Sequence, residues 1–205
     1  MPKHFQPSAP DRFAAALSRF DEVNARDPHR VVVDGAEQPR ELVYARWLTE
    51  WVLRLCPEAS ETLRLAARCQ HLGRWQVPRE SYPLTRAGYL RWREALKQFH
   101  ARQAGEILHA LGYPDDLVVK VQDLNLKKNF PHDPDSRVLE DALCLVFLER
   151  QFAALADKAT EEKMVTALQK VWRKMTPEAQ SRARTLSYGP REQSLLDRAL
   201  TPAGR

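Results

Sequence analysis

Apolar residues recur at helical spacing along nearly the whole chain, and this pattern limits the possible folds more than any other feature of the sequence. Such spacing places apolar side chains on one face of successive amphipathic helices. The 205 residues include only seven glycines, and none forms the Gly-rich cluster of a Rossmann domain or a P-loop. We therefore expect an all-α protein, a single compact multi-helix bundle over residues 11–200 with flexible ends at 1–10 and 201–205.

Capping residues and helix stops divide this pattern into separate helices. Ser60 and Thr85 each precede a helical pattern as N-caps, whereas Gly73 and Gly112 each follow one as C-terminal stops. The run Arg30–Val33 is strand-like, but four residues favour an extended connection over part of a sheet. The predicted helices span residues 10–25, 41–55, 60–72, 85–111, 114–124 and 136–156, and shorter helices begin near residues 160 and 176.

The cysteines and the lengths of the apolar runs indicate the cellular compartment of the protein. Cys56, Cys69 and Cys144 are odd in number, widely spaced and set in apolar stretches, which is typical of reduced core residues. Residues 1–10 contain no apolar run of the signal-peptide kind, and no stretch of about 18 apolar residues occurs. We therefore expect a cytoplasmic protein that has no membrane partner.

The charge favours anionic ligands without pointing to nucleic acid. The net charge is +5 and the isoelectric point is near 9.2, which is modest for a dedicated nucleic-acid binder. Basic residues are scattered among acidic ones except over Arg79–Lys97, where they outnumber them. This segment either borders a phosphate site or is an ordinary solvated helix face. A small phosphorylated ligand or nucleotide is therefore the expected partner.

Three histidine and aspartate positions follow the order of a known helical family. Residues 70–74 read Gln-His-Leu-Gly-Arg after a small, apolar helix, and His100 precedes Ala-Gly, Ile-Leu and Leu-Gly pairs at helical spacing. Asp141 then lies in an apolar helix with Glu140 before it. This order resembles the HD superfamily, which consists of helical metal-dependent phosphohydrolases. The resemblance implies a helical fold and a metal-dependent phosphohydrolase of nucleotides or related phosphate compounds.

The sequence departs from the HD pattern at its ligand positions. Gln70 stands where the family has a metal-binding histidine, and His71 takes the place of the paired aspartate. Tyr44 or Arg46 lies roughly where the first histidine belongs. The chain also resembles the family named domain of unknown function 4202, on Ala-Arg-Cys-Gln-His at 67–71, Tyr-Leu-Arg-Trp-Arg at 89–93 and Leu-Lys-Lys-Asn at 126–129. That second resemblance implies no activity.

The resemblance to the HD superfamily implies a role for each candidate residue. His71, His100 and Asp141 would offer two nitrogens and an oxygen, which suit Zn, Mn, Fe or Ni with open positions for water. Glu140 would act as the general base or orient water. The four basic residues expected to neutralise the phosphate of a substrate are Arg74, Arg79, Lys127 and Lys128.

Each of these residues also has a purely structural interpretation. His71 at a helix end can cap that helix, and His100 can be a surface residue. Glu140 and Asp141 can be the acidic first turn of a helix. The alternative to the hydrolase is therefore a degenerate HD-like domain that binds a nucleotide or a protein partner without turnover. Binding of RNA through Arg79–Lys97 is a third and weaker hypothesis.

Overall fold

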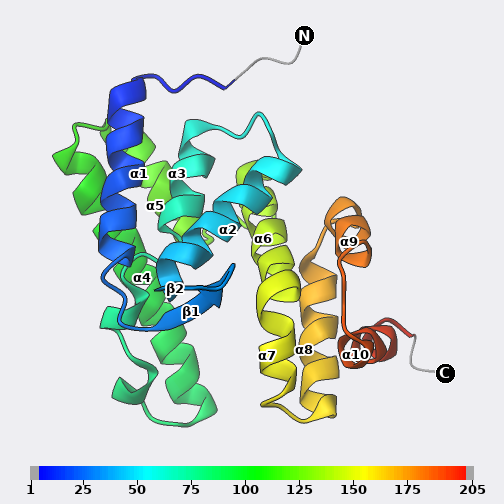
Figure 1. The fold of residues 1–205 in the computed structure, drawn as a ribbon. Coiled ribbons are helices and arrows are strands. Elements are labelled where there is room, and N and C mark those ends of the chain that lie inside the picture. The colour runs from blue at the N-terminus through cyan, green and yellow to red at the C-terminus, as the bar shows by residue number, and fades with distance from the viewer. Residues whose placement is uncertain (1–4, 202–205) are drawn as a thin grey trace. The chain divides into compact units, whose positions relative to one another are not determined.

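The computed structural model describes residues 5–201, and it confirms the all-α class (Figure 1). The chain divides into two compact units, one that ends at Ser136 and one that begins at Arg137. Each unit has its own core. Of the ends expected to be flexible, residues 1–4 and 202–205 lie outside the described residues, and Pro10 already begins a helix. The expectation of one domain over residues 11–200 stays a prediction.

The first unit is built around α3, which packs against three other helices, α1, α2 and α5, while α4 packs mainly on α5. The side chains at its centre, Phe20, Leu48, Leu63, Leu65 and Leu108, are fully buried. Burial of each stabilises the fold by about 1.5–3 kcal/mol. The helices are α1 (Pro10–Asn24), α2 (Arg40–Leu55), α3 (Glu61–Cys69), α4 (Arg86–Ala110) and α5 (Asp115–Leu126).

The predicted caps explain where these helices begin and end. Ser60 accepts a hydrogen bond from the backbone N–H of Leu63, and Thr85 accepts one from Gly88. Gly112 adopts a positive φ of 74° after α4, where a residue with a side chain would be strained. The N-caps and the stop at Gly112 are therefore confirmed.

The prediction of no sheet was wrong. Arg30–Val33 forms strand β1, which pairs antiparallel with β2 (Ala36–Pro39) in the register Val31–Gln38 and Val33–Ala36. The two residues between the strands, Asp34 and Gly35, both have positive φ, at 51° and 79°. A two-residue turn of this kind joins hairpin strands because its twist matches theirs, and Asp-Gly is one of its preferred sequences.

The second unit continues the helical pattern. Its longest pairing is α8 (Glu161–Lys174) against α10 (Pro190–Leu200), and α8 also contacts α7 (Phe152–Ala156). The predicted continuous helix over residues 136–156 is interrupted, because a π-helical turn at Phe147–Gln151 separates α6 (Pro134–Val146) from α7. Thr176 caps α9 (Pro177–Arg184), as the sequence predicts.

The cysteines and the apolar runs behave largely as expected. All three cysteines are free, and Cys69 and Cys144 are buried, whereas Cys56 is only half-buried and so does not belong to the core as predicted. Among the helices of residues 5–201, none combines the length and the apolar character that crossing a membrane requires.

Asp27 joins the hairpin to the start of α2, and we predict that this link is a large part of the first unit's stability. Its fully buried carboxylate accepts hydrogen bonds from the backbone N–H groups of His29 (2.9 Å) and Glu41 (3.0 Å). Asp27→Ala leaves both donors without an acceptor, so we expect a loss of about 2–4 kcal/mol in the free energy of unfolding. Urea unfolding followed by circular dichroism measures it. Glu106→Ala on the exposed face of α4 is the control, and an equal effect of the two variants would contradict the assigned role.

Candidate functional site

The site is centred on the turn that follows α3. This turn passes through Gly73, whose φ of 64° is left-handed, and leads into a 3-10 turn at Arg74–Gln76. The fully buried Asn24 of α1 accepts a hydrogen bond from the Gly73 N–H through its side-chain oxygen, at 3.0 Å. His71 and Arg74 therefore project from a turn that Asn24 of α1 anchors.

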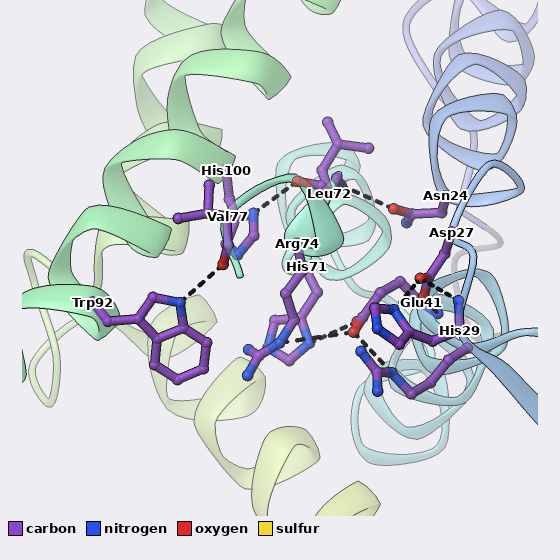
Figure 2. A network of polar contacts seen from close by, with 12 residues as sticks. Asn24, Asp27, His29, Glu41, His71, Leu72, Arg74, Val77, Trp92 and His100 are labelled. Atoms are coloured by element: carbon purple, nitrogen blue, oxygen red, sulfur yellow. Dashed lines mark hydrogen bonds and ion pairs between the residues drawn. The ribbon is translucent and has the colours of Figure 1, made fainter. Parts of the chain in front are cut away.

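Glu41 is the acidic group of the site (Figure 2). It lies in the first turn of α2 and is 3% exposed. Its Oε2 is 3.3 Å from Nδ1 of His71, and its Oε1 is 3.3 Å from Nε of Arg40 and 3.7 Å from Nε of Arg74. Burial raises the pKa of Glu41, but the hydrogen bond with His71 and the charges around it outweigh burial and leave that pKa lowered. Glu41 is thus a buried carboxylate shared by three basic side chains.

His71 is a neutral hydrogen-bond donor to this carboxylate. Burial lowers the pKa of His71 to about 4, although the hydrogen bond to Glu41 opposes the shift. The contact at 3.3 Å is therefore a hydrogen bond from a neutral ring and not an ion pair. Since Nδ1 carries the hydrogen, Nε2 carries the lone pair. The ring stacks on Tyr44 of α2, with centroids 4.2 Å apart and planes inclined by 8°.

His100 also carries its ring hydrogen on Nδ1, but its partner is a backbone carbonyl and not Glu41. It lies on α4, is 3% exposed, and its Nδ1 is 2.7 Å from the carbonyl oxygen of Leu72. A carbonyl oxygen only accepts, so Nδ1 donates and Nε2 carries the lone pair. Within residues 5–201 this buried Nε2 has no hydrogen-bond partner. Burial and the neighbouring His71 lower the pKa of His100 to about 3, and the two rings lie 5.8 Å apart.

Guanidinium groups surround the two imidazoles. Arg74 lies over the ring of Trp92 at 5.0 Å, and the indole N–H of Trp92 donates to the carbonyl of Val77. Burial lowers the pKa of Arg74, Glu41 opposes that shift, and the charge of Arg93 on α4 reinforces it. Arg93 also disfavours protonation of His71. The site therefore holds three guanidinium charges, those of Arg40, Arg74 and Arg93, against two carboxylates, that of Glu41 and that of Asp27, which accepts from the Glu41 backbone N–H.

Buried polar atoms without a partner gather at the same turn. Within the described residues, such atoms include Oε1 of Gln70, Nε1 of Trp75 and Oε1 of Gln103. Nδ2 of Asn24 and Nε2 of His100 belong to the same group. Most buried polar atoms in native proteins are hydrogen-bonded, so several orphans at one turn mark it as a place where a polar ligand or water would bind.

The other three basic residues predicted to contact phosphate lie in the loop before α4 or at the end of α5. Arg79 donates to the carbonyl oxygens of Tyr82 and Pro83 at 2.8 Å, so it closes the loop before α4. Lys127 ends α5 in the left-handed conformation with φ at 58°, and Lys128 pairs with Asp123 at 2.6 Å. Arg79 and Lys128 thus have partners within the protein, and the role of Arg79, Lys127 and Lys128 in binding phosphate stays a prediction. Of the four basic residues predicted, Arg74 is the one at the imidazole cluster.

Asp141 and Glu140 lie in the second unit, where both have partners. The carboxylate of Asp141 accepts from the backbone N–H of Thr176 at 2.9 Å and from its hydroxyl at 2.6 Å. Burial raises the pKa of Asp141, although the Thr176 contacts oppose the shift. Glu140 pairs with Lys174 at 3.1 Å. Asp141 thus orients the residue that caps α9, and the predicted cluster of His71, His100 and Asp141 stays a prediction.

The structure adds residues that sequence reasoning missed. Glu41 and Arg40 were not singled out, because an acid and an arginine in the first turn of a helix are ordinary features. Arg93 was considered only as part of the basic segment Arg79–Lys97. No signal in the sequence distinguishes a buried acid from an exposed one at such a position. Tyr44 was noted only because it stands where the HD pattern has its first histidine.

Comparison of the sequence with known protein families gives one match. A family described as a domain of unknown function, number 4202, matches residues 14–196. The chain belongs to this family. No curated protein and no solved structure matches the chain. Membership in the family confirms the second resemblance drawn from the sequence, whereas the HD resemblance stays a prediction.

The depressed histidine pKa values predict how the first unit responds to acid. In the unfolded chain His71 and His100 protonate near pH 6.5, but in the folded protein they protonate only near pH 4 and pH 3. Unfolding therefore takes up protons between pH 6.5 and pH 4, so the free energy of unfolding falls as the pH is lowered through this window. We expect each histidine to contribute a loss of about 2 kcal/mol between about pH 7 and pH 5.

Urea unfolding at several pH values, with a chelator present, measures this loss. His100→Gln is expected to remove about half of it, whereas His109→Gln, at a half-exposed ring on the same helix, is the control. An unchanged slope in His100→Gln would show that His100 is not held neutral by the fold.

Proposed function

We propose that this chain binds a small phosphorylated compound, a nucleotide or a related phosphate ester, at the cluster of Glu41, His71, Arg74 and His100. One observation carries the proposal, the excess of guanidinium over carboxylate charge around a largely buried turn. Among these guanidinium groups that of Arg74 is the largely buried one, with a side chain 22% exposed, and a poorly solvated charge attracts a counter-ion more strongly than a charge in water. A phosphate group is the common biological anion that would balance this excess.

Arg74 is the residue best suited to hold the phosphate. Its Nε is directed to Glu41, and its guanidinium plane lies against Trp92, so the side chain is oriented before any ligand arrives. Within residues 5–201 its two terminal nitrogens donate no hydrogen bond. A guanidinium presents such nitrogens as a planar fork that matches two phosphate oxygens. Pre-orientation reduces the entropy lost on binding, which favours affinity.

Metal-dependent hydrolysis of the phosphate compound is the second candidate function. It is favoured by the tautomers of His71 and His100, because each ring donates through Nδ1 to an oxygen acceptor and keeps a lone pair on Nε2, as metal-bound histidines do. A bound Zn, Mn, Fe or Ni ion would polarise the phosphate and activate water. In this account His71 and His100 would bind the ion, and the roles of Asp141 and Glu140 stay predictions from the sequence.

The donor set supports this second candidate only in part. Catalytic zinc sites use three protein ligands. Within residues 5–201 no group of three or more His, Cys, Asp or Glu side chains is arranged to hold a metal ion. The carboxylate of Asp141 already accepts two hydrogen bonds from Thr176. Binding of a phosphate compound therefore stands as the primary proposal, and its hydrolysis as the second.

The primary proposal is tested by comparing two arginine variants of the full-length chain, both with the substitution in the first unit. Arg74→Ala removes the pre-oriented guanidinium and is expected to weaken binding of adenosine monophosphate at least about tenfold, since charge-assisted hydrogen bonds contribute about 1.5–3 kcal/mol. Arg102→Ala, at an exposed arginine of α4 that pairs only with Glu106, is the matched control. Isothermal titration calorimetry gives the dissociation constants. Equal affinity of the two variants, or no binding to the unaltered protein, would contradict the proposal.

Elemental analysis of protein purified without a polyhistidine tag separates the two candidate functions. A stoichiometric transition metal that is lost in His100→Ala would make the hydrolase the better account. Hydrolysis of the nucleotide, followed as phosphate release, would then be the activity to assay.

A further inference from the structure

We infer that the ligand of this site is a phosphate monoester that also carries a hydroxyl group, and that buried Nε2 of His100 accepts the hydrogen of that hydroxyl. The inference rests on the proposed phosphate binding and names the class of compound that the site selects. It assigns His100 as the residue that determines specificity, whereas the guanidinium groups supply the attraction for phosphate.

The tautomer of His100 follows from its surroundings. Its Nδ1 lies 2.7 Å from the carbonyl oxygen of Leu72, which cannot donate, so the ring hydrogen is at Nδ1. Figure 2 shows this nitrogen directed to Leu72 and the rest of the ring on the side of Arg74 and His71. The lone pair of Nε2 is buried, with no donor among the residues that the structure describes.

His71 cannot satisfy that lone pair. Its own hydrogen is at Nδ1, directed to Glu41, so its Nε2 is a second acceptor. Two neutral rings 5.8 Å apart thus both present lone pairs, and neither has a hydrogen to offer the other.

A ligand must therefore bring a donor as well as an anion. A phosphate dianion has only acceptor oxygens, which suit the guanidinium nitrogens of Arg74 but would meet a lone pair at His100. A hydroxyl group avoids this unfavourable contact, because its hydrogen pairs with the buried Nε2 of His100, an acceptor that is otherwise left unpaired. A phosphate monoester of a polyol or a sugar carries both groups in one small molecule.

Two probes that differ in their hydroxyl groups test the inference. Glycerol 3-phosphate and propyl phosphate share the phosphate monoester and the length of the carbon chain, but propyl phosphate has no hydroxyl. The unaltered protein is expected to bind glycerol 3-phosphate about ten- to a hundredfold more tightly in calorimetry, as a site built for a hydrogen-bond donor does. His100→Leu should abolish this preference, so that the two probes bind with similar affinity. His100→Gln, which keeps one donor and one acceptor, should restore part of it.

Nitrogen NMR of the unaltered protein gives a readout that does not depend on how the variants fold. Glycerol 3-phosphate is expected to shift the Nε2 resonance of His100, and propyl phosphate to leave it in place. Equal affinity for both probes, or an unmoved resonance, overturns the inference while phosphate binding stands. Binding of neither probe overturns the proposed function as well. A stoichiometric divalent metal on the unaltered protein that His100→Leu removes would assign Nε2 to the metal and overturn the hydroxyl role.

Discussion

The site depends on one buried carboxylate, that of Glu41. A buried charge is stable only when it is paired and hydrogen-bonded, and Glu41 meets that condition through His71, Arg74 and Arg40. The same contacts determine which nitrogen of His71 carries its hydrogen and where Arg74 points. The carboxylate of Asp27 in turn accepts a hydrogen bond from the backbone N–H of Glu41 and so fixes the start of α2. A chain of polar contacts therefore runs from the hairpin to the imidazole pair.

This arrangement explains why the site attracts anions although its histidines are neutral. Burial removes the imidazoles as a source of positive charge at neutral pH. The positive potential comes instead from the guanidinium groups of Arg40, Arg74 and Arg93. The imidazoles are left with the other function available to them, which is to accept a hydrogen or to bind an ion.

The fold could be predicted from the sequence where local chemistry decides it. Side-chain caps such as Ser60 and the stop at Gly112 act within one helical turn, so their patterns gave the helices to within a few residues. The hairpin was missed although its signal is also local, because the turn at Asp34 and Gly35 was given less weight than the shortness of the first strand. The site was harder to predict, since burial of Glu41 and the pairing of Asp141 with Thr176 depend on contacts between residues far apart in the chain.

The tautomers of His71 and His100 are the central claim, because both the acceptor role and the metal-ligand role follow from them. Long-range nitrogen–hydrogen correlation NMR on uniformly labelled, metal-free protein at neutral pH measures them directly. The account predicts two neutral rings that carry their hydrogen on Nδ1 and stay neutral as the pH is lowered through 6.5. A hydrogen on Nε2 of His100, or protonation of both rings near their ordinary pKa, would contradict it.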